Sequence, residues 1–160
     1  MELERHDATA AHWSPEQYER MFSPAGDQGS ERIVLVVEDC NLVEGIGETP
    51  GETSLGKNST RNVSTMIAFL VANRVGTERE IENIVVAAGA RRRGIATRLL
   101  GEFMAHARTE HPGSVSLEVR ESNLAARALY RKIGFEEVGE RRGYYANPTE
   151  AAIICSVTIC

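Results

Sequence analysis

A buried strand that leads through a short turn into a helix is the feature that most constrains this chain. The strand is the apolar run at residues 84–87, and the helix begins near Gly94, directly after Arg91-Arg92-Arg93. The first N–H groups of a helix have no partner within the helix, and together with the positive end of the helix dipole they bind phosphate. Gly94 and Ala96 lack bulk, so the backbone can close on a pyrophosphate. The segment from Arg91 to Ala96 is explained equally well as a solvated basic turn that precedes a helix and binds no phosphate.

Two better-known phosphate loops are excluded. No Lys-Ser/Thr pair follows the glycine, so this is not a Walker loop, and the G-x-G-x-x-G of a dinucleotide fold is missing. The net charge of −5 makes nucleic-acid binding through three arginines the weaker reading.

Length and composition predict a single soluble domain spanning residues 1–160, with 42% hydrophobic and 26% charged residues. No apolar run approaches the roughly 20 residues that span a bilayer. The start, Met1-Glu2-Leu3-Glu4-Arg5, is too acidic for a secretory signal. We therefore expect a cytoplasmic protein.

The cysteines and histidines predict neither a disulfide framework nor a metal site. The three cysteines are odd in number and show no C-x-x-C spacing, and the four histidines form no ligand motif. These residues are Cys40, Cys155, Cys160, His6, His12, His106 and His111.

Periodicity predicts the order of the elements. A capped helix begins at Ser14, and residues 41–63 are interpreted as a long polar loop. Apolar residues every four positions from Gly94 predict an amphipathic helix, and a second helix ends at Gly134. The fold class is α/β (α+β) with a mixed sheet. The predicted helices span 14–22, 94–108 and 123–132, and the strands 33–37, 66–72, 80–87, 115–119, 135–138 and 151–157.

Several motifs together resemble the GNAT family of N-acetyltransferases. Arg91-x-x-Gly94-x-Ala96 after a strand is similar to the family's pyrophosphate motif, with Ala96 where glycine often stands. Further blocks resemble one subfamily, the bacterial ribosomal-protein-alanine N-acetyltransferases. They are Trp13-Ser14, Leu117-Glu118-Val119-Arg120-Glu121-Ser122-Asn123, Ala128-Leu129-Tyr130, Gly134-Phe135 and Arg141-Arg142-Gly143-Tyr144-Tyr145.

The resemblance implies a mostly antiparallel sheet that splays open between its central parallel strands, with helices on both faces. The family opens with a strand and most of a helix before the region of Trp13, and only twelve residues stand there in this chain. We therefore expect the family's first strand to be missing here, which would expose the edge of the 33–37 strand. We expect a homodimer through that edge.

The resemblance also implies acetyl-CoA as cosubstrate, with no metal. The backbone of Ile84, Val85 and Val86 would pair with the pantetheine arm, and Asn123 would contact acetyl-CoA from across the cleft. The pyrophosphate would be held by the amides of Arg91, Arg92, Arg93, Gly94, Ile95, Ala96 and Thr97.

Two residues match the family's acid–base pair. Glu118 matches the general base, which takes a proton from the attacking ammonium, and Tyr130 matches the general acid, which protonates the departing thiolate. Read without the family, Glu118 is a polar residue of an alternating strand and Tyr130 a packing tyrosine on a helix.

Four residues are candidates for binding the acceptor. Tyr144 and Tyr145 are expected in the connection between the last two strands, with Trp13 on the other side of the acceptor mouth. Glu82, and with it Glu80, could face a cationic peptide. The plain alternatives are a turn for the tyrosines, a hydrophobic staple for Trp13 and a solvated strand face for the glutamates.

Three functions remain open from the sequence. The first is acetylation of a protein N-terminus, with a small-subunit ribosomal protein as the possible partner. The second is the same chemistry on a small amine such as a polyamine or an antibiotic. The third is a non-catalytic acyl-CoA-binding module, which would need neither Glu118 nor Tyr130. No nucleic acid or membrane partner is expected.

Overall fold

The computed structural model describes residues 16, 19, 30–44 and 60–160. Glu16 and Glu19 are helical, in agreement with the capped helix expected over 14–22, and the rest of that helix lies outside the described residues together with Trp13.

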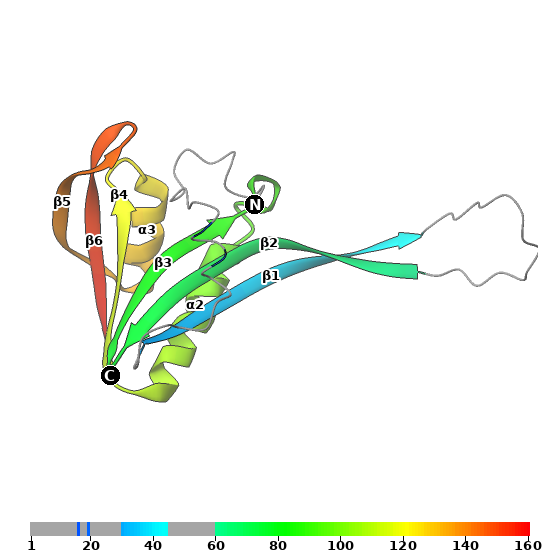
Figure 1. Ribbon diagram of the computed structural model, residues 1–160, viewed down its shortest axis with the longest axis horizontal. Helices are drawn as coiled ribbons and strands as arrows, with labels where there is room; N and C mark the ends of the chain where they lie inside the picture. Colours follow the sequence, from blue (N-terminus) through cyan, green and yellow to red (C-terminus); the bar gives the residue numbers. More distant parts are fainter. Residues whose placement is uncertain (1–15, 17–18, 20–29, 45–59) are drawn as a thin grey trace, which may run out of the picture.

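The order of the elements agrees with the sequence prediction from residue 30 onward (Figure 1). Each predicted strand and helix in the described ranges has its counterpart, with ends that differ by a few residues or more. The elements are β1 (Ser30–Glu44), β2 (Thr60–Val75), β3 (Glu78–Val86), η1 (Ala88–Ala90), α2 (Ile95–Glu110), β4 (Gly113–Arg120), α3 (Leu124–Ile133), β5 (Glu136–Ala146) and β6 (Thr149–Ile159).

The strands form one mixed sheet in the order β1-β2-β3-β4-β6-β5. All neighbouring pairs are antiparallel except β3 and β4, which run parallel. The parallel pairing covers only Glu78–Ile81 against Ser114–Leu117, although both strands continue beyond it. The sheet is therefore split between β3 and β4 toward their carboxyl ends, as the resemblance implies.

Both described helices pack against the same face of the sheet. The buried side of α2 comprises Leu99, Leu100, Phe103, Met104 and Ala107, which confirms the predicted amphipathic period. These residues share one hydrophobic core with Tyr130 of α3 and with apolar residues of all six strands except β5. In Figure 1, α2 and α3 lie behind the sheet. Helices on the opposite face stay an expectation, because the described elements contain none there.

Local signals fix the ends of α3. The side chain of Asn123 accepts a hydrogen bond from the backbone N–H of Ala126 at 3.1 Å, which caps the helix start. At the other end Gly134 adopts φ 107°, a left-handed conformation that glycine enters without a steric penalty. The turn then sends Phe135 back into the core.

The interpretation of residues 41–63 as a loop is wrong at both ends. Residues 41–44 belong to β1 and residues 60–63 to β2, and the two segments pair with each other. Beyond a bulge at Val37/Glu38 these strands form a two-stranded ribbon that extends away from the rest of the sheet (Figure 1). A ribbon outside the core needs no apolar alternation, so the sequence carried no strand signal there. Residues 45–59 lie outside the described residues.

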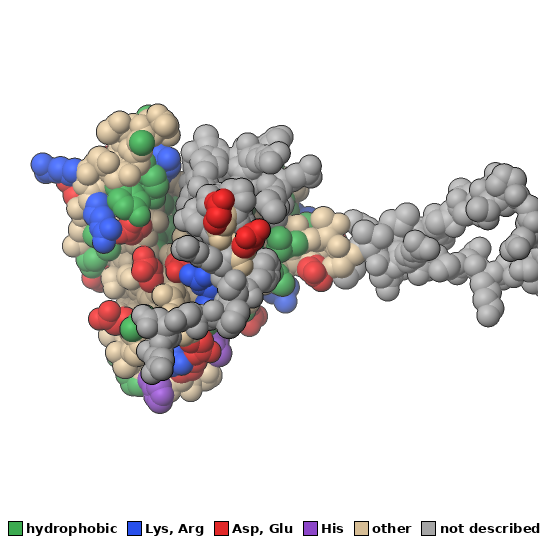
Figure 2. Space-filling view, viewed as in Figure 1, with side chains coloured by type: hydrophobic (Ala, Val, Ile, Leu, Met, Phe, Trp, Pro, Cys, Tyr) green, Lys and Arg blue, Asp and Glu red, His purple; other side chains and the backbone are tan. Residues whose placement is uncertain are grey.

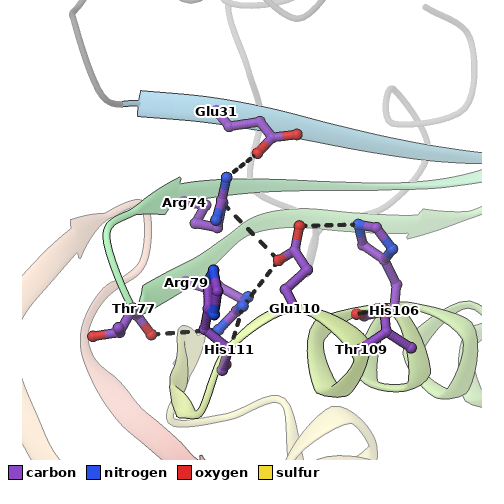
Figure 3. Close-up of polar contacts among 8 residues, drawn as sticks. All are labelled: Glu31, Arg74, Thr77, Arg79, His106, Thr109, Glu110 and His111. Carbon is purple, nitrogen blue, oxygen red and sulfur yellow. Dashed lines mark hydrogen bonds and ion pairs between the residues drawn. The ribbon is translucent and has the colours of Figure 1, made fainter.

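A network of ion pairs ties the end of α2 to the sheet (Figure 3). The fully buried Arg79 of β3 donates to Glu110 Oε2 of α2 at 2.9 Å, and Arg74 of β2 pairs with Glu31 and lies 4.0 Å from the same Glu110 oxygen. His106 approaches Glu110 Oε1 at 3.6 Å. The pKa of Glu110 is lowered, chiefly by its hydrogen bond from Arg79.

Glu110→Gln is expected to lower the free energy of unfolding by about 1–2 kcal/mol at pH 7, because the buried guanidinium of Arg79 loses its charged partner. Since the pKa of Glu110 is depressed in the folded state, this contribution is present above the unfolded glutamate pKa of about 4.3 and is lost as the pH falls through the folded value. Urea unfolding at pH 7 and pH 3 measures it. Glu102→Gln, on the exposed side of α2, is the control and should change nothing. An equal loss at both pH values would contradict the account.

A second stability prediction concerns Gly113, the first residue of β4. A Cβ on Gly113 would lie 1.9 Å from the carbonyl oxygen of Thr77 and 2.9 Å from its carbon, both backbone atoms that cannot easily move aside. Gly113→Ala is therefore expected to cost about 2 kcal/mol in urea unfolding. Gly101→Ala is the matched control. Gly101 lies inside α2 with nothing within 4 Å of an added Cβ, so alanine there should stabilise by about 0.5–1 kcal/mol. Equal effects at the two positions would contradict this prediction.

Candidate active site

The split between β3 and β4 opens into a cavity of about 600 Å³. Its walls come from both sides of the sheet, since Glu118 of β4 and Tyr130 of α3 both line it. Leu117 and Val119, the neighbours of Glu118, belong to the core on the side of α2 and α3, so Glu118 projects toward the other face. The splayed strands thus let residues from the two faces meet in one cavity.

One end of the cavity is the start of α2. Gly94 precedes the helix with φ 77°, and no side chain of the described residues caps it. The amides of the first turn therefore point toward the cavity without a helical partner. The lining here includes Arg91, Arg92, Gly94, Ile95, Ala96 and Thr97. This end has the charge and the backbone donors that a pyrophosphate requires.

Three of the residues expected to bind acetyl-CoA, two at the pyrophosphate and one along the pantetheine arm, lie differently from the rest. Arg91 donates from Nε to the carbonyl of Val86 at 3.2 Å, so its side chain folds back onto the end of β3. Arg93 is exposed and is not part of the lining. The side chain of Val85 packs with Phe69 and Val71 on the far face of the sheet, while its neighbours Ile84 and Val86 line the cavity. The side-chain position of Val85 does not conflict with the expectation, because it is the backbone of Val85 that was expected to pair with the pantetheine arm.

Glu118 lies in a polar cluster on the sheet face opposite α2 and α3. Its Oε1 forms an ion pair with Arg141 Nε at 3.0 Å, and Tyr144 lies near the same carboxylate. The negative charge of Glu118 is the largest cause of the raised pKa of Tyr144. Glu80 lies nearby, and its pKa is raised first by burial and then by the charge of Glu118. The Glu118 side chain is 17% exposed, so part of it remains open to solvent.

Tyr130 is buried within the core and lines the cavity from the helix side. Its ring meets Phe135 edge to face, with centroids 6.0 Å apart. Burial raises the pKa of Tyr130 well above the usual tyrosine value. The hydroxyl therefore keeps its proton at neutral pH, which is the state a proton donor needs.

The sequence interpretation missed Arg120, which shares a strand face with Glu118. Arg120 is buried, and its guanidinium lies 4.0 Å from the centre of the Tyr145 ring and pairs with Glu150 at 2.5 Å. Glu150 also accepts from the backbone N–H of Ser122 at 3.1 Å. This arrangement holds the Tyr145 ring in the cavity wall. The two-residue period of a strand could have predicted this, because residues 118 and 120 of β4 project from the same face.

Some of the residues expected to bind the acceptor line the cavity as predicted, and others lie elsewhere or are held by other side chains. Tyr144 and Tyr145 lie within β5 and not in the connection after it, because β5 continues to Ala146 and resumes its pairing with β6 at Tyr145 after a break. Tyr145 lines the cavity. Glu82 also lines it, but its carboxylate is held by Arg32 of β1 at 3.0 and 3.1 Å, so Glu80 and not Glu82 accompanies Glu118. Asn123 lines the cavity at the start of α3.

Within the described ranges, no cluster of three or more histidine, cysteine or acidic side chains could hold a metal ion. None of the described helices is long and apolar enough to cross a membrane.

A sheet split at its parallel pair, with a helix start that no described side chain caps at one end of the split, is the arrangement that the resemblance to the N-acetyltransferases implies. The model of the Acetyltransferase (GNAT) family matches residues 2–135, and the chain belongs to this family.

Relatives of known sequence point to the same subfamily as the motifs. The chain is 43% identical over 89 residues to the N-alpha-acetyltransferase RimI of Mycobacterium tuberculosis, covering 53% of this chain and 54% of that protein. It is 36% identical over 111 residues to the ribosomal protein bS18-alanine N-acetyltransferase of Escherichia coli, covering 68% and 74%. The chain thus spans about half the length of the mycobacterial relative.

A solved structure shares the fold over nearly the whole chain. The ribosomal-protein-S18-alanine N-acetyltransferase of Escherichia coli aligns with a TM-score of 0.65 at 26% identity, covering 94% of this chain and 81% of that one.

Proposed function

We propose that this chain is a single-domain enzyme that transfers the acetyl group of acetyl-CoA to a primary amine, and that the amine is the N-terminal alanine of a protein. The observation that carries the proposal is the one cavity that joins the uncapped start of α2, Glu118 and Tyr130. Family membership and relatives that are named as ribosomal-protein-alanine N-acetyltransferases support the acceptor. A ribosomal acceptor would place the reaction in the cytoplasm.

The residues present fit acetyl-CoA. Beyond Ile81 the edge of β3 that faces β4 has no partner among the described strands, so the backbone of residues 82–86 can pair with an extended chain. The first turn of α2 can hold the pyrophosphate, and Asn123 faces the cavity from the other wall. Bound there, acetyl-CoA supplies an activated thioester.

Each acid–base role follows from the position and protonation of its residue. The ammonium of the acceptor must lose a proton before it can attack, and the accessible carboxylate of Glu118 takes it, directly or through a water molecule. A backbone N–H near Val86 can donate to the developing oxyanion. The hydroxyl of Tyr130, held protonated by burial, donates its proton to the leaving thiolate. Attack is direct, so no side chain is acylated.

Release of free CoA from acetyl-CoA tests the acceptor class. The purified protein is offered a basic peptide that begins with alanine, the same peptide with a blocked N-terminus, and a panel of polyamines and aminoglycosides. Turnover with the free peptide alone is expected. Turnover with small amines alone would keep the chemistry and overturn the acceptor, and silence with acetyl-CoA still bound would identify a binding module.

A further inference from the structure

The ion pair between Arg141 and Glu118 has a consequence for the acceptor. Glu118 is the carboxylate that must receive the proton of the incoming ammonium, yet in this structure its Oε1 is already paired with a cation, since Arg141 Nε lies 3.0 Å away. The ammonium and the guanidinium therefore compete for one carboxylate. Figure 2 shows acidic and basic side chains intermixed on this face of the molecule.

The two partners of this ion pair differ in how firmly they are held. The side chain of Glu118 is 17% exposed and lies within the well-paired strand β4, whereas that of Arg141 is 60% exposed. Arg141 lies at the break in the pairing of β5 with β6, since Cα pairing stops at Arg141 and resumes at Tyr145. Its guanidinium carbon also lies 5.8 Å from the centroid of the Tyr144 ring, and its charge acts on Glu80. Arg141 can therefore swing into solvent while Glu118 stays in place.

We propose that Arg141 is a specificity-determining residue that occupies Glu118 in the free enzyme and must be displaced by the ammonium of the acceptor. The inference rests on the proposed function. Only the fraction of enzyme in which Glu118 is unoccupied can bind the acceptor ammonium. The apparent dissociation constant of every acceptor therefore equals the intrinsic constant divided by this fraction. A neutral amine cannot replace the guanidinium on the carboxylate, so the exchange favours acceptors that arrive as cations. Acetyl-CoA binds at the other end of the cavity and does not take part in it.

The neighbouring arginine supplies a matched control. Arg142 follows Arg141 in the same strand and is 90% exposed, but its Nε pairs with Glu140 at 2.7 Å. Arg141→Gln and Arg142→Gln therefore remove the same charge from adjacent positions, and only the first frees Glu118. Both residues are exposed, so both variants are expected to fold, and thermal unfolding verifies this.

Steady-state kinetics with an alanine-starting peptide is the first test. Arg141→Gln is expected to lower the acceptor KM about three- to five-fold, the range for a partly exposed ion pair, with kcat and the KM for acetyl-CoA unchanged. Arg142→Gln should match the wild type. An unchanged or higher acceptor KM in Arg141→Gln would overturn the proposal, because Arg141 would then be a bystander or would itself bind the acceptor.

A binding measurement separates this inference from the proposed function. Calorimetry with alaninamide, a minimal ammonium probe, needs no turnover and is performed with CoA present. Tighter binding to Arg141→Gln than to the wild type and Arg142→Gln is expected, even if no tested acceptor is acetylated. Equal binding to all three proteins, or binding to none, would show that the ammonium does not go to Glu118 and would overturn the proposal.

Discussion

Glu118→Gln is expected to slow acetyl transfer about 100-fold at pH 7, the usual scale for the loss of a general base. The amide keeps the size of the side chain but cannot take the proton from the ammonium. The deficit should shrink above about pH 8, where an N-terminal amine has already lost its proton in solution. Rates measured from pH 6 to pH 9.5 with saturating acetyl-CoA test both statements.

The control for this variant is Glu140→Gln, which removes the same charge from an exposed side chain in β5. It should retain the wild-type rate and pH profile. A near-normal rate in Glu118→Gln, or a deficit that stays constant across the pH range, would remove Glu118 from the role of base.

Tyr130→Phe is expected to lower kcat about 100-fold while both KM values stay near those of the wild type, because only the proton donor to the thiolate is lost. The ring and its packing against Phe135 are kept, so the protein should fold normally. Since burial raises the pKa of Tyr130, the wild-type rate should show no loss from its ionisation up to about pH 10, the ordinary tyrosine value. An alkaline fall below pH 9 that Tyr130→Phe abolishes would contradict this assignment, as would a normal kcat.

The fold was predictable wherever one face of an element is buried. The four-residue period of α2 and the alternation in β4 are consequences of packing against a core, and both were read correctly from the sequence. The outer part of the β1–β2 ribbon pairs with no third strand in the described part of the chain, so no hydrophobic pattern marks it. Its strands were therefore interpreted as a loop.

In the candidate site, too, the features that depend on a local segment were predictable, and the contacts between distant strands were not. The phosphate-binding end depends on backbone and small residues in one short segment, so local spacing was enough to predict it. The partners of the carboxylates come from strands distant in the sequence, as when Arg32 of β1 binds Glu82 of β3. Arg141 reaches Glu118 from a break in β5 pairing that no residue pattern announces. Such contacts depend on sheet order, which a single sequence does not supply.

The central claim is that the split between β3 and β4 is the acetyl-CoA site, and hydrogen–deuterium exchange with and without acetyl-CoA tests it most directly. Acetyl-CoA should protect the amides of residues 82–86 and 91–97 and slow exchange near Asn123, while the amide of Asn147 in the β5–β6 turn stays unchanged. These segments are the free edge of β3, the start of α2 and the far wall of the cavity. Protection confined to other segments, or no protection at a saturating concentration, would contradict the account.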